Sequence, residues 1–295
     1  MGVLEFKNVN RGFGATPVLK GISFAVTPGE VVGLLGCNGA GKTTLINLVM
    51  GMLAVDDGTV RVFGQDPRRD PMAVRRRIGY VAEDQELPPF LRVGEVLALY
   101  RGLFAGWHQE TADALVERFG LPLGRKVSDL SRGQARQVAL LCAVSHRPEL
   151  LILDEPAGGL DPAARREFLE TSIRLLNETG TTILFSSHHM GDVERMASRL
   201  IMIHEQEKWI DSALDDIRDG YSLALVPGEA ATADQLLALG DCLCARQRGS
   251  ALHAVFATDP EACHATLARH LGREDHQCRP LPLEEMFIEL VGRGS

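Results

Sequence analysis

One nine-residue stretch near the start of the chain limits the possible folds more than any other feature. It matches the pattern G-x-x-x-x-G-K-[ST], and its residues are Gly36, Cys37, Asn38, Gly39, Ala40, Gly41, Lys42, Thr43 and Thr44. The apolar run 30–35 before it has the length of a strand, and the run 45–50 after it is typical of a helix. Glycines let backbone N–H groups approach a phosphate, and a helix N-terminus adds a positive dipole end. The stretch therefore predicts a phosphate-binding loop between a strand and a helix.

Two side chains of this loop suit a nucleotide. Lys42 can reach the β- and γ-phosphates, and the Thr43 hydroxyl can ligate Mg²⁺. The alternative is a chance glycine-rich turn before a helix. Because the strand, the lysine and the hydroxyl are all in place, the sequence favours a nucleotide site.

Two other apolar runs end in polar side chains. The run 150–153 ends in Asp154 and Glu155, and the run 181–185 leads to His188. An Asp at such a strand end suits Mg²⁺ held beside a phosphate loop, and Glu155 could orient or deprotonate a water. His188 could sense a γ-phosphate, whereas a lone histidine is usually structural. The alternative, a strand end that happens to be acidic, is disfavoured beside a phosphate loop.

Two more positions keep an alternative open. Ser131 precedes a predicted helix over about 135–146, where it can act as N-cap and add a second phosphate-friendly helix start. Phe13 lies in a predicted turn over 11–14 between strands 4–9 and 18–26. It could stack on a nucleotide base or pack on the sheet, and spacing alone favours packing.

The rest of the chain divides into a helical part and a different C-terminal part. From Val93 to about Leu115, apolar residues recur at three- and four-residue spacing, which predicts helix. Residues 220–295 predict the order β-α-β-β-α-β and a final helix, which indicates a small ferredoxin-like α+β domain. Its cysteines and histidines could bind a metal, but their spacing fits no zinc pattern, and cysteines in strands and helices are more often small hydrophobic residues.

Charge and apolar pattern exclude several classes of protein. The 295 residues carry a formal net charge of −8, which argues against nucleic acid as a partner because phosphate backbones require clustered Lys and Arg. No apolar run approaches the ~18–20 residues that span a bilayer, and no leader pattern opens the chain. Six cysteines in a chain of this length do not indicate a disulfide framework. We expect a soluble, cytosolic chain.

Taken together, these motifs resemble the ATPase subunit of an ATP-binding cassette (ABC) transporter over about residues 1–215. The signals follow in the family's order: the phosphate loop, Leu-Ser-x-Gly-Gln at 130–134, the Asp-Glu strand end, Gly-Leu-Asp at 159–161 and Ser-Ser-His at 186–188. The resemblance implies an α/β fold, with a RecA-like P-loop core and a helical subdomain over about 86–147. It gives an ATPase domain over 1–218 and an accessory domain over 219–295. The tail 283–290 is similar to those of bacterial ABC-2 drug- and polymer-exporter ATPases.

The resemblance also implies roles for single residues. Residues 36–44 would bind the triphosphate of ATP and Phe13 would stack on adenine. Lys42 would stabilise the γ-phosphate, Glu155 would be the general base, and His188 would touch the γ-phosphate. Mg²⁺ would be held by Thr43 and Asp154. The signature residues would close on the ATP of a second subunit in a head-to-tail dimer, and the residues of this seam are Ser131, Gly133, Gln134 and Asp161.

Two positions depart from the family pattern. Arg132 stands where the family has glycine, and Glu83 stands where the family has a glutamine that joins Mg²⁺ to the membrane subunit. A carboxylate can still ligate Mg²⁺, so we expect function with altered coupling. Gln85 is the alternative for that role.

The sequence therefore predicts an ATP-hydrolysing subunit that powers transport, and export in particular, through a separate integral membrane permease. The chain would lie peripherally at the cytoplasmic face of the inner membrane. The alternative is a soluble cassette ATPase that acts on ribosomes or DNA, but such proteins usually carry two cassettes or a coiled-coil insert. A regulatory subunit without turnover is disfavoured because Glu155 and His188 are both present.

Overall fold

The structure is a computed structural model that describes residues 2–291, and its contacts divide the chain into two compact units, Met1–Asp211 and Ser212–Ser295. The division falls seven residues before the expected boundary at 218/219. The helix α8 (Leu214–Gly220), which the sequence pattern did not predict, is thereby grouped with the second unit.

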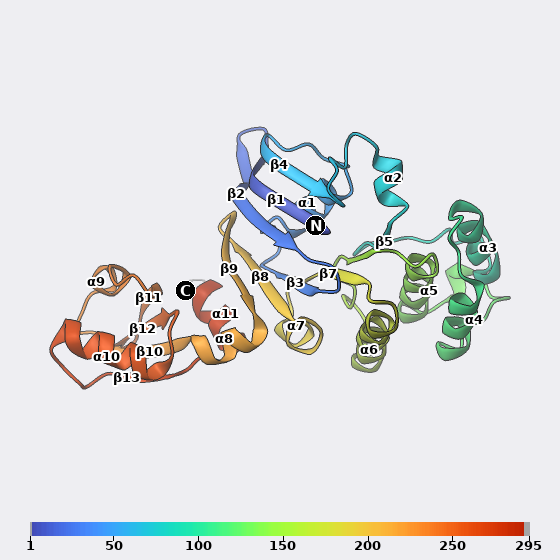
Figure 1. Cartoon of the computed structure of the whole chain (residues 1–295). Helices are drawn as coiled ribbons and strands as arrows, with labels where there is room; N and C mark the ends of the chain where they lie inside the picture. Colours follow the sequence, from blue (N-terminus) through green and yellow to red (C-terminus); the bar gives the residue numbers. More distant parts are fainter. Residues whose placement is uncertain (1, 292–295) are drawn as a thin grey trace. The chain divides into compact units, whose positions relative to one another are not determined.

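A six-stranded sheet forms the centre of the first unit (Figure 1). Its strands, in spatial order, are β5 (Ile78–Val81), β6 (Leu150–Leu153), β7 (Thr182–Ser187), β3 (Val31–Leu35), β8 (Arg199–His204) and β9 (Glu207–Ala213). The first five run parallel to their neighbours. Every residue of β3, β6 and β7 is buried, which explains why these strands are continuous apolar runs rather than alternating ones. The carboxyl ends of these three strands therefore lie together at one edge.

A smaller antiparallel sheet packs over the phosphate-loop helix. Its strand order is β2-β1-β4, with bounds Thr16–Val26, Leu4–Phe13 and Asp57–Val62. One apolar core joins this sheet, the helix α1 (Lys42–Val49) and the central sheet. The predicted turn over 11–14 is wrong in extent, because β1 continues through Phe13. Asp56 holds this end of the strand: its carboxylate accepts from Arg11 Nη1 at 2.6 Å and from Gly12 N at 2.7 Å.

Most helices of the first unit follow amphipathic runs of the sequence. Their bounds are α2 (Pro71–Arg75), α3 (Val93–Leu103), α4 (Gln109–Arg118), α5 (Arg132–Val144), α6 (Pro162–Thr179) and α7 (Met190–Met196), with a 3₁₀ turn over Val127–Asp129. The helical pattern predicted from Val93 to about Leu115 forms two helices, since the chain leaves the helix at Phe104 and enters the next at Gln109. The Phe104 ring stacks on His146 at 4.1 Å, and His108 N donates to Ser145 O at 2.6 Å, so this break is packed against the end of α5.

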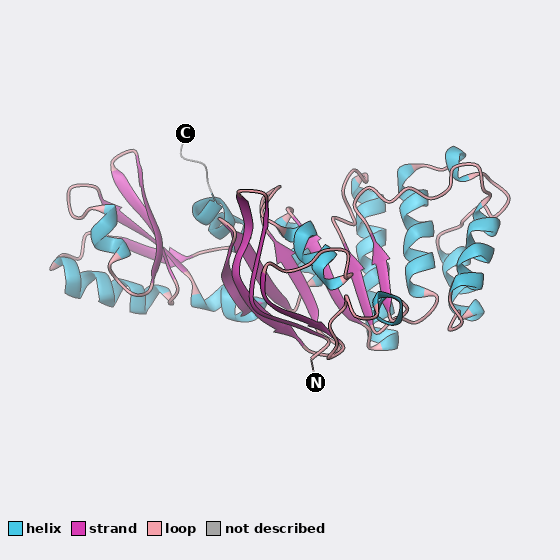
Figure 2. Ribbon diagram, turned by 90° about the horizontal axis from the view of Figure 1, so that it is seen from above, coloured by secondary structure: helices cyan, strands magenta, loops and turns pink. Residues whose placement is uncertain are grey.

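The second unit contains the predicted β-α-β-β-α-β order. Its elements are β10 (Ser222–Pro227), α9 (Ala233–Leu237), β11 (Cys242–Arg248), β12 (Ala251–Phe256), α10 (Pro260–Leu271), β13 (Gln277–Pro280) and α11 (Leu283–Val291). The spatial strand order is β11-β12-β10-β13 and all three pairings are antiparallel, so the hairpin β11–β12 lies beside the first strand (Figure 2). This is the ferredoxin-like arrangement.

The two faces of this sheet are covered by different helices. Helices α9 and α10 place Leu236, Cys263 and Leu267 in one apolar core with the inward residues of β10 and β12. The final helix α11 covers the opposite face, where Cys244 Sγ lies 3.5 Å from Glu289 O.

Candidate functional site

Residues 36–41 form a loop between β3 and α1, the context that the motif requires. Two glycines are needed for this path. A Cβ at Gly36 would lie 2.7 Å from Ile203 O, and one at Gly41 would lie 2.7 Å from Leu19 Cδ2, while Gly41 also has a φ of +104°. The loop curls around Lys42, whose side chain is 6% exposed and whose Nζ donates to Gly36 O at 2.7 Å. Thr43, at the first turn of α1, is exposed.

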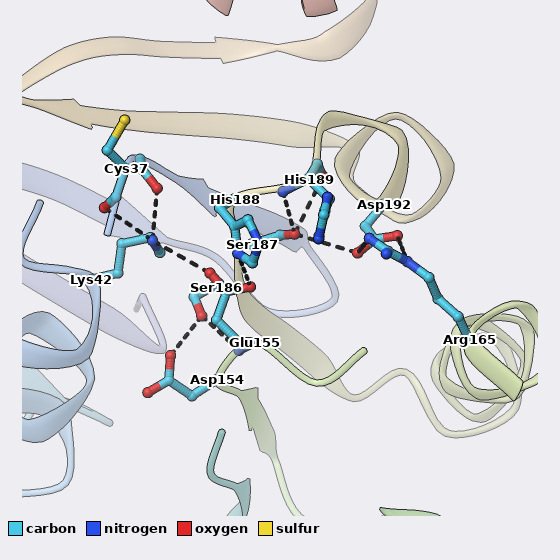
Figure 3. Close-up of polar contacts among 11 residues, drawn as sticks. Cys37, Lys42, Asp154, Glu155, Arg165, Ser186, Ser187, His188, His189 and Asp192 are labelled. Atoms are coloured by element: carbon cyan, nitrogen blue, oxygen red, sulfur yellow. Dashed lines mark hydrogen bonds and ion pairs between the residues drawn. The ribbon is translucent and has the colours of Figure 1, made fainter. Parts of the chain in front are cut away.

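The acidic end of β6 is fixed by a serine from β7 (Figure 3). Ser186 Oγ donates to Asp154 Oδ1 at 2.6 Å and accepts from Glu155 N at 2.8 Å. Glu155 has a φ of +45°, a left-handed conformation that costs on the order of 1 kcal/mol outside glycine. The serine hydroxyl thus orients one carboxylate and holds the strained backbone of the next residue.

The Glu155 carboxylate lies between two nitrogen groups. Its Oε1 is 3.4 Å from Lys42 Nζ, and its Oε2 is 2.8 Å from His188 Nδ1 (Figure 3). Both Lys42 and Glu155 are buried, so the opposite charges stabilise each other where either alone would be costly. The structure therefore brings Lys42, Asp154, Glu155 and His188 together from three chain segments, at the carboxyl edge of the sheet.

A second polar network lies directly beside this cluster. Arg165 of α6 makes a bidentate ion pair with Asp192 of α7, at 2.8 and 2.6 Å. Ser187 Oγ donates to Asp192 Oδ2 at 3.3 Å and accepts from His189 N at 3.0 Å. Burial and the positive charge of Arg165 lower the pKa of His189, which favours the neutral ring. The network fixes the backbone that carries His188.

The sequence motifs did not reveal the roles of Ser186, Arg165 and Asp192. The available signal was the polar pair at 186–187 in an otherwise apolar strand, because a hydroxyl in a fully buried strand needs a partner. The partners themselves come from other elements and could not be found by spacing.

The loop that carries Glu83 follows β5 and is held by α5. The Arg136 guanidinium donates to the carbonyl oxygens of Ala82 and Glu83, and Gln85 Oε1 accepts from Ala82 N at 3.2 Å. Burial, followed by the negative charges of Glu155 and Asp154, raises the pKa of Glu83. Glu83 therefore lies within electrostatic reach of the acidic cluster, whereas the Gln85 oxygen is used to shape the loop.

The Leu-Ser-x-Gly-Gln segment forms the start of α5. Ser131 and Gln134 make a reciprocal capping box, with Gln134 N donating to Ser131 Oγ at 3.2 Å and Ser131 N donating to Gln134 Oε1 at 3.1 Å. The helix therefore begins at Arg132, three residues before the predicted start. A Cβ at Gly133 would lie 3.3 Å from Ala164 Cβ, so glycine allows α5 and α6 to approach closely.

The departure from the family pattern, Arg132, faces the loop before α6. Its Nη1 lies 3.6 Å from where a Cβ of Gly159 would be. Asp161 caps α6, since its Oδ1 accepts from the backbone N–H groups of Ala163 and Ala164 at 3.0 Å each. The signature and the Gly-Leu-Asp loop are therefore neighbours in this unit, and Asp161 has a local structural task.

Two findings concern other predicted features. Phe13 lies at the exposed end of β1, 49% accessible, with the Arg11 guanidinium carbon 4.8 Å from its ring centroid. Within residues 2–291, no group of three or more His, Cys, Asp and Glu side chains is arranged to hold a metal ion by itself. Among the same residues, no helix has the length and apolar character that crossing a bilayer requires.

Comparison with known proteins agrees with this fold. Residues 19–158 match the family described as ABC transporter. The chain is 35% identical over 300 residues to Nod factor export ATP-binding protein I of Paraburkholderia xenovorans (strain LB400), with 98% of this chain and 97% of the relative covered. It is 36% identical over 210 residues to linearmycin resistance ATP-binding protein LnrL of Bacillus subtilis (strain 168), covering 70% and 67%.

A solved structure described as the ATP binding subunit of an ABC transporter has 31% identity and a TM-score of 0.67, over 73% of this chain and 92% of that one. The fold, the phosphate loop and the signature define a cassette ATPase. The chain belongs to the ATP-binding subunits of ABC transporters. The transport prediction is thereby supported over the alternative of a soluble cassette that acts on ribosomes or DNA.

Proposed function

We propose that this subunit hydrolyses ATP with Glu155 as general base and drives export through a separate membrane permease. The observation that carries the proposal is the position of the Glu155 carboxylate between Lys42 Nζ and His188 Nδ1. A buried carboxylate held from both sides has a fixed direction, and a base must be positioned before it can take a proton from water. The strained, serine-anchored backbone at Glu155 supports the same assignment.

ATP would lie along residues 36–44, with its adenine on the exposed ring of Phe13. The phosphates would compete with Glu155 for the Lys42 amine, because that amine is the buried cation at the loop. Lys42 would then neutralise charge on the transferring γ-phosphate, and His188 would contact it while keeping its Nδ1 toward Glu155.

The chemistry of the donor groups fits Mg²⁺. This ion commonly keeps several waters and binds through one or two carboxylates together with substrate phosphates, so a complete protein cage is not required. Asp154, oriented by Ser186, and the exposed hydroxyl of Thr43 would hold it, with Glu83 as an additional carboxylate. When bound, Mg²⁺ supplies charge neutralisation on the phosphates.

Two copies would close head to tail on ATP, with Ser131, Gly133, Gln134 and Asp161 at the seam. A related cassette, MJ0796, has been solved as a dimer. The permease would be a separate integral membrane chain, and the subunit would lie at the cytoplasmic face of the inner membrane. Export is favoured by the names of relatives that match nearly the whole chain, such as Nod factor export ATP-binding protein I.

Glu155→Gln tests this function. The amide keeps the shape of the side chain but cannot accept the proton, so hydrolysis should fall by about 10²–10⁴-fold while ATP binding persists. Steady-state ATPase assays and light scattering with ATP are the measurements, and the variant should accumulate as an ATP-bound dimer. Glu117→Gln, at an exposed position of α4, is the matched control and should turn over normally. Turnover of Glu155→Gln close to that of the control would refute the assignment.

A further inference from the structure

Three cysteines gather in the core of the second unit. Cys263 of α10 is fully buried, and Cys242 of β11 and Cys278 of β13 are partly buried against the same apolar cluster. The sulfur atoms of Cys263 and Cys278 are 3.3 Å apart, with the Cys278 thiol donating to Cys263 Sγ. The two residues come from different elements and are separated by 15 positions in the sequence.

The distance between these two sulfur atoms is not far above that of a disulfide bond. A disulfide has an S–S length of about 2.05 Å, so the sulfurs must approach by about 1.3 Å. Cys278 belongs to β13, which is an edge strand of the sheet and pairs only with β10 among the described strands. An edge strand held from one side can shift by this distance more readily than an interior strand.

The hydrogen bond between the two thiols shifts their pKa values in opposite directions. The hydrogen bond from Cys278 lowers the pKa of Cys263, and the same bond, followed by burial, raises the pKa of Cys278. Thiol oxidation needs a thiolate as nucleophile and a second sulfur to resolve the intermediate. The contact places a sulfur with a lowered pKa next to a second sulfur.

We propose that Cys263 and Cys278 form a redox-sensitive pair that hydrogen peroxide oxidises to a disulfide. In the first step a sulfur attacks the peroxide, the O–O bond breaks, and a sulfenic acid and one water form. In the second, the other thiol attacks the sulfenic sulfur, the S–O bond breaks, and a second water leaves. One hydrogen peroxide thus accepts two electrons and two protons from the two thiols. A dithiol reverses the reaction by exchange.

The bond would join α10 to the edge strand β13. It would close the segment 264–277, and closing a loop of this length removes conformational freedom from the unfolded chain. Oxidation should therefore raise the melting temperature of the second unit by roughly 10 °C. Because Lys42, Asp154 and Glu155 belong to the first unit, this inference does not rest on the proposed ATPase mechanism.

The test uses the full chain and hydrogen peroxide at near-stoichiometric amounts, followed by alkylation, trypsin digestion and mass spectrometry. Cleavage after Arg and Lys places Cys263 in peptide 249–269, Cys278 in peptide 274–293, and Cys242 with Cys244 in peptide 219–246. The expected product is a cross-link between the first two peptides, two hydrogens lighter than their sum, which dithiothreitol reverses. Oxidation of these thiols to sulfinic acid without a cross-link, or a cross-link that involves peptide 219–246 instead, would overturn the proposal.

Matched variants separate the pair from general cysteine chemistry. Cys278→Ser should remove both the cross-link and the rise in melting temperature, and calorimetry of the untreated variant checks that it is folded. Cys244→Ser should retain both, because Cys244 lies on the opposite face of the sheet against α11. An equal rise in melting temperature in Cys278→Ser would show that another reaction stabilises the chain.

Discussion

The two units of this protein differ in the surroundings of their buried charged side chains. In the first unit, Lys42, Asp154 and Glu155 are buried within one site, and Glu155 has a left-handed backbone. In the second, the buried carboxylate Glu289 faces Arg248 and His253, each at 3.3 Å. These partners are 43% and 24% exposed, so both side chains keep contact with water. The first arrangement gathers buried charges at the carboxyl edge of the central sheet, whereas the second joins α11 to β11 and β12.

This difference teaches where a polar side chain serves chemistry and where it serves packing. Ser186 links the Asp154 carboxylate and the backbone N–H of Glu155 to the neighbouring strand, so that the left-handed backbone of Glu155 is held in place. Glu289 has no positive φ and lies in the second half of α11. Substitutions in the two units should therefore separate activity from stability.

Lys42→Ala should produce the largest effect. The loop loses the buried cation that the phosphates would contact, so ATP binding should become undetectable in equilibrium measurements with labelled nucleotide. The fold should persist, since α1 is held by Leu45, Ile46 and Leu48 in the apolar core. Lys20→Ala, at an exposed position of β2, is the control. Near-normal ATP affinity in Lys42→Ala would contradict the assignment of the loop.

Glu289→Ala should lower stability and leave activity unchanged, which is the reverse of the effect expected for Lys42→Ala. Arg248 and His253 lose their buried partner, at a cost of about 2 kcal/mol, because both can recover part of their hydration. Calorimetry of the full chain should show the second unit melting about 10 °C lower, with the ATPase rate unchanged. Glu289→Gln keeps an acceptor oxygen, so its melting temperature should lie between those of Glu289→Ala and the wild type. A loss of ATPase activity without a loss of stability would contradict the assignment of Glu289 to stability alone.

Glu83→Gln should give the smallest effect, and one that depends on pH. Burial and the charges of Glu155 and Asp154 raise the pKa of Glu83 in the folded chain, so its charged form is disfavoured there. The resulting destabilisation of the folded chain is absent at pH values below the ordinary pKa of Glu83 and is complete above its raised pKa. The variant should therefore melt slightly higher than wild type at pH 7.5, by less than about 2 °C because the side chain is exposed, and the gap should shrink toward pH 4.5. Lower stability of the variant at pH 7.5 would contradict this.

Much of the fold was predictable because its signals are local. The buried strands β3, β6 and β7 are short apolar runs, and the order of elements in the second unit follows from alternation and helix caps. The sequence analysis failed where packing overrides a local pattern. The helical periodicity over 93–115 is continuous, but Phe104 leaves the helix to stack on His146. The seven-residue α7 is too short for periodicity to reveal.

The site was predictable only in part for the same reason. Parallel strands deliver their carboxyl ends to one edge, which is why Lys42, Asp154, Glu155 and His188 could be expected as neighbours. Their roles in catalysis stay predictions. The contacts that hold them, such as Ser186 with Asp154 or Arg136 with the backbone of Glu83, join residues more than 30 positions apart. No spacing rule specifies such pairs. None specifies the contact between Cys263 and Cys278 either.

The strand order of the central sheet has a consequence for synthesis of the chain. The phosphate-loop strand β3 pairs with β7 and β8, so Val31 lies beside Ile183, 152 positions later (183 − 31). At 5–20 residues per second, the ribosome needs about 8–30 s to supply that partner. During this interval the loop has emerged but its supporting strands have not. The nascent chain should therefore bind nucleotide only late in translation. Binding of ATP would then indicate that β7 and β8 have paired with β3.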